Sequence, residues 1–134
     1  MASELRVNTL KDASGNNSIA TSFVAQGSAK VSGSLSMAGT AAIFSGSLNT
    51  SSLTDNGTGD GTIAFTNSFS NTTHAYQFNG KYDDGASNDD VPNVGHFRQA
   101  TSASNVRFIV QIPDASNNAG DGNSVTFTVF GDLA

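Results

Sequence analysis

The side chains of this chain that could do chemistry are the acidic and amide groups of two polar segments, residues 83–92 and 113–123. Oxygen ligands at short spacing on a flexible loop can hold Ca²⁺, but neither segment follows the EF-hand spacing and no Glu closes either loop. We therefore expect no metal, and interpret both segments as solvated loops that expose binding residues. These candidate binding residues are Asp83, Asp84, Asn88, Asp89, Asp90, Asn117, Asn118 and Asp121.

Other catalytic groups are sparse. His74 and His96 are the two histidines, and a metal pair would require them to converge. No Gly-x-Ser-x-Gly elbow frames a nucleophilic serine, because residues 33–37 lack the closing Gly. Glu4 is the single glutamate, which disfavours a paired-acid glycoside hydrolase. The glycine-rich residues 57–61 precede an expected strand, whereas a phosphate-binding loop precedes a helix. We expect no enzyme activity and no cofactor.

Composition narrows the class of partner. The 134 residues suit one domain, and the net charge of −5 with only 6 Lys and Arg argues against binding to a phosphate backbone. We therefore expect no nucleic-acid binding. No apolar run reaches the length of a membrane span, so we expect no membrane insertion. There is no Cys, so disulfides and thiolate metal sites are excluded. Abundant Ser, Thr, Asn and Gly disfavour helix and favour strands with tight turns.

Alternating apolar residues predict the strands that must position these loops. The strongest pattern places Val106, Phe108, Val110 and Ile112 on one face of a strand over residues 106–112. Further strands are expected at residues 61–66, 74–82, 94–100 and 125–130, the last with Val125, Phe127 and Val129 inward. Such strands, separated by turn signals, predict an all-β fold: an antiparallel β-sandwich, jelly-roll-like or a small barrel.

A hairpin is predicted where the glycine-rich residues 57–61 separate two polar strands. After this turn, Ile63, Phe65 and Phe69 fall on one face.

Aromatic residues on the strand at 74–82 have two interpretations. Tyr76, Phe78 and Tyr82 share a face and could stack on sugar rings, but their alternation favours the core, most clearly for Phe78.

The first half of the chain is poor in large apolar residues. Short strands are expected at residues 4–10 and 19–24, with a helix near 22–30 as the alternative. A segment of this kind is ordered by packing on another chain, or else stays disordered. We therefore predict an extended N-terminal arm with an oligomerisation and attachment region over residues 1–50, and a β-sandwich domain over residues 51–134.

Three motifs follow one another in an order typical of one class of protein. They are residues 3–10 with the Gly/Asn loop after them, Ser28-Ala29-Lys30-Val31, and the long block at residues 51–67. Over these residues the chain resembles tail-fibre-like and appendage structural proteins of marine and cyanobacterial bacteriophages. It departs from them after Lys30, where the family commonly carries a Trp that this chain lacks.

The resemblance implies a β-rich virion protein, often trimeric, without catalytic residues. We therefore expect a non-enzymatic homotrimer whose polar loops bind a glycan or protein of the host surface. Its arm would attach it to other virion proteins of the tail or capsid through Leu5, Arg6, Val7 and Asn8. Two alternatives stay open: a capsid decoration (cement) protein that stabilises the head lattice and, less favoured, a glycan-cleaving enzyme.

Overall fold

The computed structural model describes residues 6–15, 18–82, 91–111 and 118–134, and the side chains of residues 81–82 and 91–101 are left out of this description. The elements within these ranges are, in order, β1 (Thr9–Lys11), β2 (Ser18–Ala20), α1 (Thr21–Gly27), β3 (Ala29–Ser36), β4 (Ala42–Ile43), β5 (Thr50–Gly57), β6 (Asp60–Phe65), β7 (Ala75–Tyr82), β8 (Val91–Ser102), β9 (Asn105–Gln111) and β10 (Ser124–Phe130). The fold is all-β with one short helix in the described part, as the composition predicts.

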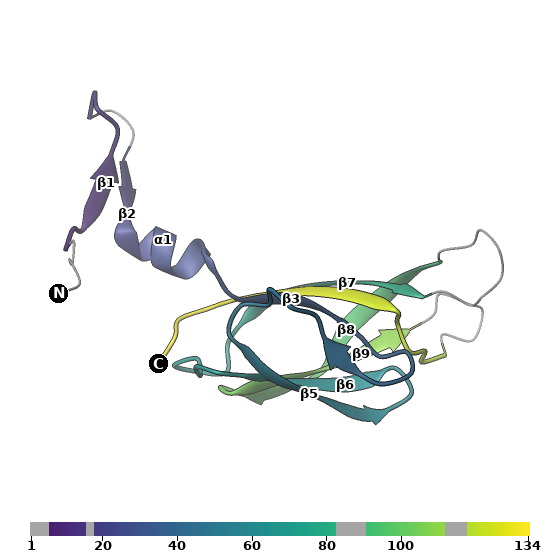
Figure 1. The fold of residues 1–134 in the computed structure, drawn as a ribbon. Coiled ribbons are helices and arrows are strands. Elements are labelled where there is room, and N and C mark those ends of the chain that lie inside the picture. Colours follow the sequence, from purple (N-terminus) through teal and green to yellow (C-terminus); the bar gives the residue numbers. More distant parts are fainter. Residues whose placement is uncertain (1–5, 16–17, 83–90, 112–117) are drawn as a thin grey trace.

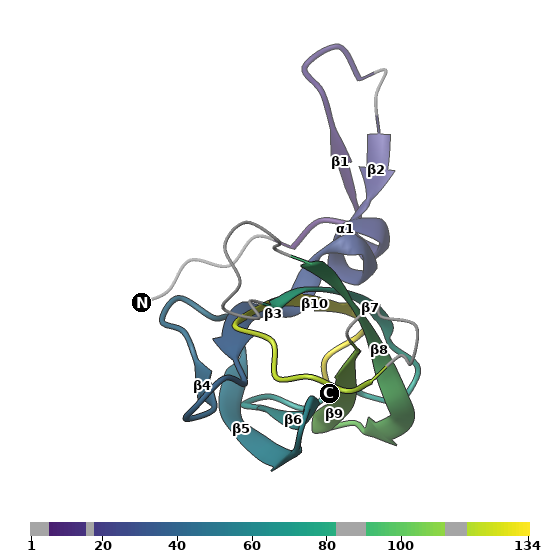
Figure 2. The ribbon, with the colours of Figure 1, turned by 90° about the vertical axis from the view of Figure 1, so that its right-hand side faces the viewer.

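A single antiparallel sheet contains β3 to β10 in the order β4-β3-β10-β7-β8-β9-β6-β5. The long strand β8 connects the two halves of this sheet. Its first residues pair with β7 and its later residues pair with β9, so it turns a corner between two layers. Figures 1 and 2 show the sheet curling until the two layers face each other. This architecture is compatible with the predicted sandwich or small barrel.

The chain between β4 and β5 forms the opposite corner. β4 pairs with β3, and the backbones of Phe44 and Leu48 continue along β3 by bonding to Ser34 and Ser32. β5 then pairs with β6 in the other layer. The bend between the two pairings lies at Asn49, a non-glycine residue with φ 55°. The curled sheet is therefore bridged on both sides, and we refer to β3–β10 as the barrel.

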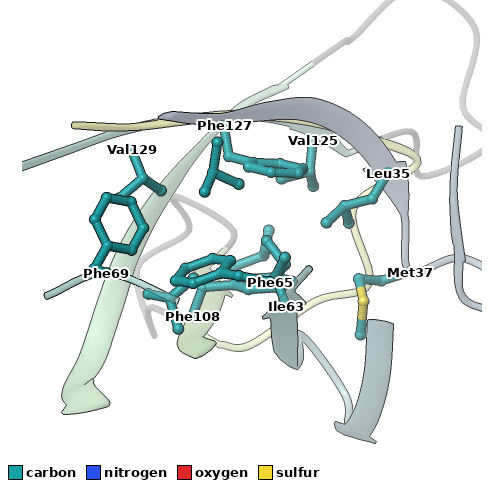
Figure 3. Close-up of a cluster of buried hydrophobic side chains, with 12 residues drawn as sticks. Leu35, Met37, Ile63, Phe65, Phe69, Phe108, Val125, Phe127 and Val129 are labelled. Carbon is teal, nitrogen blue, oxygen red and sulfur yellow. The ribbon is translucent and has the colours of Figure 1, made fainter. Parts of the chain in front are cut away.

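The core lies between the two layers. In the described part of the chain the buried hydrophobic side chains are those of Val31, Leu35, Met37, Ile63, Phe65, Phe69, Val106, Phe108, Val110, Val125, Phe127 and Val129. Figure 3 shows Leu35, Val125 and Phe127 facing Ile63, Phe65 and Phe108 across the interior. Each such side chain stabilises the fold by about 1.5–3 kcal/mol on burial. The inward faces predicted at 61–69, 106–110 and 125–130 are confirmed, and Ile112 lies outside the described residues.

The structure differs from the predicted division at residue 50. β3 pairs along its length with β10, and its Val31 and Leu35 are fully buried. The barrel therefore begins at Ala29, and β3 and β4 belong to it. The physical reason is that few apolar residues suffice when a strand lies between two neighbours. Gly33 of β3 leaves room for the Ser47 side chain and for the Phe127 ring on the adjacent strand β10.

Residues 6–28 stand away from the barrel (Figures 1 and 2), and we call them the N-terminal segment. It consists of the β1–β2 hairpin followed by α1, and no residue of α1 is buried. Residues 4–5 of the strand predicted at 4–10 lie outside the described residues, and of residues 6–10 only Thr9 and Leu10 belong to a strand, β1. The predicted strand at 19–24 ends at Ala20, and the helix, the alternative for this region, occupies Thr21–Gly27. The Thr21 hydroxyl donates to the carbonyls of Val7 and Asn8 and joins the hairpin to the helix.

Candidate interaction surfaces

The glycine-rich turn between β5 and β6 packs against the end of β9 and the chain that precedes β10. The predicted hairpin is confirmed, with Gly57 opposite Asp60 in the register. The Gly59 N–H donates to Oδ1 of Asp121 at 2.6 Å, and the Gly59 carbonyl accepts from Val110 N at 2.7 Å. Gly59 has φ 67°, and an added Cβ would lie 2.6 Å from the Val110 carbonyl oxygen. Asp121, a predicted binding residue, therefore holds this turn against the end of the barrel.

The other predicted binding residues divide into two groups. Asn118 is described and exposed. Asp83, Asp84, Asn88, Asp89, Asp90 and Asn117 lie outside the described residues, as does Leu5 of the predicted arm. Arg6, Val7 and Asn8 are described and exposed. Within the described residues, no group of three or more His, Cys, Asp or Glu lies close enough together to hold a metal ion.

A charged cluster that the sequence did not predict lies on the outer face of β5, β6 and β9. Arg107 donates to Asp60 through Nε–Oδ1 at 2.8 Å and Nη2–Oδ2 at 2.6 Å. Asn56 Nδ2 also reaches Asp60 Oδ1, at 3.3 Å, and Thr62 Oγ1, at 2.8 Å. The hydrogen bonds to Asp60, together with its negative charge, raise the pKa of Arg107 above its ordinary value. Asp60 is buried, so this carboxylate acts as a structural anchor between strands.

His74 belongs to an aromatic cluster at the edge of the core. Its ring lies 4.3 Å from the Phe69 ring, centroid to centroid, and 6.0 Å from that of Tyr76. Nε2 is 2.7 Å from the Asn71 carbonyl oxygen, while Nδ1 is buried without a hydrogen-bond partner in the described part of the chain. A shallow hollow of about 380 Å³ adjoins it, where Gln26 of α1 approaches the C-terminal residues. The imidazole thus serves in packing, and the side chain of His96 is not described.

Tyr76 and Phe78 of β7 pack against the core. The Phe78 ring lies 4.9 Å from the Phe108 ring, centroid to centroid, and Tyr76 packs against the same buried cluster. The core interpretation of Phe78 is therefore confirmed, and that of Tyr76 agrees with it. The side chain of Tyr82 is not described. Tyr76 and Phe78, which pack against the core, therefore do not form an open platform for a sugar.

The N-terminal segment exposes a set of large apolar side chains. Leu10 and Ile19 lie directly opposite each other across the β1–β2 pair. Phe23 of α1 is 70% exposed, the highest value among the large hydrophobic residues described. We call this set the N-terminal apolar face; its members are Val7, Leu10, Ile19, Phe23 and Val24.

A second apolar surface lies on the corner between β4 and β5. Phe44 is 43% exposed and Leu48 is 50% exposed. Their backbones bond inward to β3, so their side chains are what this corner presents outward. We call residues 44–48 the seam.

The distribution of charge links the two apolar surfaces and is visible in the sequence. Lys30 is the only charged residue between Asp12 and Asp55. Its Nζ donates to the Ala25 carbonyl and to Ser28, and so satisfies groups at the C-terminal end of α1. Apart from Glu4 and Asp12, every acidic residue lies at or after Asp55. An uncharged run around exposed apolar residues is the signal by which sequence reasoning could have found the seam and the part of the N-terminal apolar face formed by Ile19, Phe23 and Val24.

Comparison of the chain with protein-family models, with curated proteins and with solved structures found no match. Among the described residues, no helix is long and apolar enough to cross a membrane.

Proposed function

We propose that this chain is a non-enzymatic structural protein of a bacteriophage virion, of the tail-fibre or surface-appendage type. It acts as a homotrimer that is attached through the N-terminal segment. The polar loops at 83–92 and 113–123 bind a glycan or protein of the host surface. The motifs at residues 3–67 support the class of protein, and the arrangement of the two ends of the barrel supports the division of roles.

The observation that carries this proposal is that the strand ends that border the polar loops lie at the opposite end of the barrel from the N-terminal segment. Ser124, at the start of β10, lies opposite Lys81 near the end of β7, and Val94 of β8 lies opposite Gln111 at the end of β9. These strand ends border the two polar loops. Ala29 instead pairs with Phe130, at the other end of β10. A seven-residue strand spans about 20 Å, which separates attachment from presentation.

The N-terminal segment has the properties of an attachment element. An isolated hairpin is marginally stable in water, and so is a helix of seven residues. Here both are formed while their apolar side chains remain exposed to solvent. Contact with another chain would bury these side chains and supply the missing stability.

The capsid decoration protein is the second candidate, and the same exposed face supports it, because a coat lattice could equally cover that face. The copy number separates the two roles. A fibre is present in a few tens of copies per particle, whereas a decoration protein is present in hundreds.

The proposal is tested by quantitative mass spectrometry of purified particles of a phage whose genome encodes this chain. We expect the chain in the particles, at a few tens of copies. Hundreds of copies would assign it to the head surface. Absence from the particles would overturn the virion role altogether.

A further inference from the structure

We propose that the N-terminal apolar face of one copy packs on the seam of a second copy of this chain. The inference rests on the oligomer of the proposed function and deepens it, because it names the two surfaces that join the copies. The partner that covers the exposed hairpin and helix is thus the corner between β4 and β5 of its neighbour.

The N-terminal apolar face requires a cover that its own barrel does not give. Phe23 is largely exposed, and Leu10 and Ile19 each expose more than two fifths of their surface. Figure 1 shows the hairpin projecting beyond the barrel. Covering these side chains by another copy removes apolar surface from water in a segment that has no core of its own.

Charge selects a second copy as the partner. A chain with net charge −5 repels its own copies at most of its surface. β2 and α1 fall in an uncharged run from Ala13 to Ala29, and the seam falls in a second uncharged run that ends before Asp55. Pairing Ile19, Phe23 and Val24 with the seam joins uncharged stretches of chain and keeps the acidic residues after Asp55 away from the contact.

The seam matches this role in position as well as in chemistry. Leu48 bonds to Ser32, only a few residues from Ala29, where the N-terminal segment leaves the barrel. Phe44, at the other end of the seam, bonds to Ser34, so the seam lies alongside the middle of β3. The contact is heterologous, and such contacts close into rings when the rotation between copies permits.

Cysteine cross-linking tests the contact, because the chain has no Cys of its own. The full-length variants Phe23→Cys and Leu48→Cys carry different tags and are either co-expressed or expressed singly, then oxidised. We expect a disulfide-linked pair of unlike chains only on co-expression. Thr126→Cys, at an exposed position of β10, replaces Leu48→Cys in the matched control and should give no cross-link.

A second measurement uses variants that leave the core intact. Phe23→Ser and Leu48→Ser, both at exposed positions, should each lower the association constant about tenfold or more in sedimentation equilibrium, with unchanged circular dichroism. Cross-links between two Phe23→Cys chains without the mixed pair would overturn the seam as the partner, and so would an absence of all cross-links. The number of copies per phage particle, measured by mass spectrometry, does not depend on these outcomes. A failure of the proposed contact is therefore distinguishable from a failure of the proposed virion role.

Discussion

Asn49 makes the corner between β4 and β5 through both its backbone and its side chain. Its φ of 55° lies in the left-handed region, which Asn tolerates better than most residues. Its Oδ1 accepts from Asn67 N at 2.7 Å, and its Nδ2 donates to the Asn67 carbonyl at 3.1 Å. The residue thus fixes the bend and joins it to the chain that follows β6.

Replacing Asn49 should destabilise the barrel in proportion to what is lost. Asn49→Ala loses the side-chain bonds and strains the backbone, and should lower the free energy of unfolding by about 2 kcal/mol. Asn49→Gly loses the same bonds without that strain and should cost about 1 kcal/mol. Urea denaturation measures both. Equal destabilisation by the two variants would contradict a role for the backbone conformation.

Gly61 is a position where the packing leaves no space for a side chain. It pairs with Phe108, and a Cβ added to it would lie 2.5 Å from Cζ of that ring. Gly61→Ala should therefore cost about 1–3 kcal/mol, because the core must move to accept the methyl group. The same change at Gly27, where nothing lies within 4 Å, is the matched control and should be nearly neutral. The double variant with Phe108→Leu should be destabilised by less than the sum of the two single variants; simple additivity would refute the steric cause.

At this scale the sequence predicts inward faces better than it predicts outward contacts. Alternation alone places Phe108 and Phe127 in the core, because a strand has a side-chain period of two. The pairing of Asp60 with Arg107 depends on the register of strands that are 47 residues apart in sequence, which no local pattern records. Asp121 is a predicted binding residue, yet its carboxylate accepts from the Gly59 N–H. No local pattern records this contact either, because Gly59 and Asp121 lie far apart in the sequence.

At the scale of elements, the boundary between the N-terminal segment and the barrel is the finding that the sequence did not predict. The sequence of β3 contains few large apolar residues, and its Val31 and Leu35 are separated by small residues. Its burial depends on β10, which lies almost a hundred residues later and pairs along the whole of β3. Hydrophobic content judged over a local window therefore underestimates a strand that tertiary pairing places inside a sheet.

Two truncations test this boundary. A variant that begins at Ala29 retains β3 and should unfold cooperatively. A variant that begins at Ser51 lacks β3 and β4 and should be unfolded, because β10 would lose a neighbour and the core would lose Val31 and Leu35. Circular dichroism during heating distinguishes these results. Cooperative folding of the shorter variant would restore the division at residue 50.

A shorter deletion, of residues 1–20, tests attachment separately from folding. The deletion removes the β1–β2 hairpin and leaves every strand of the barrel in place. We expect an almost unchanged melting temperature for the barrel and a loss of incorporation into phage particles. Normal incorporation of this variant, measured by mass spectrometry of particles, would show that the hairpin is not the attachment element.

At the scale of the whole molecule, the barrel separates two chemically different ends. The strand ends that border the acidic loops lie at one end, and the N-terminal segment with its exposed Phe23 leaves from the other. The composition predicted the polar loops and the resemblance predicted the oligomer. The opposite placement of the two ends follows from strand register and could not be derived from composition.

The oligomeric state in solution tests the central claim most directly, since an attachment segment that joins copies is the basis of the proposed role. Light scattering at micromolar concentration should give the mass of three chains for the full-length protein. The variant that begins at Ala29 should give the mass of one folded chain. A full-length protein that remains a folded monomer under these conditions would contradict the account.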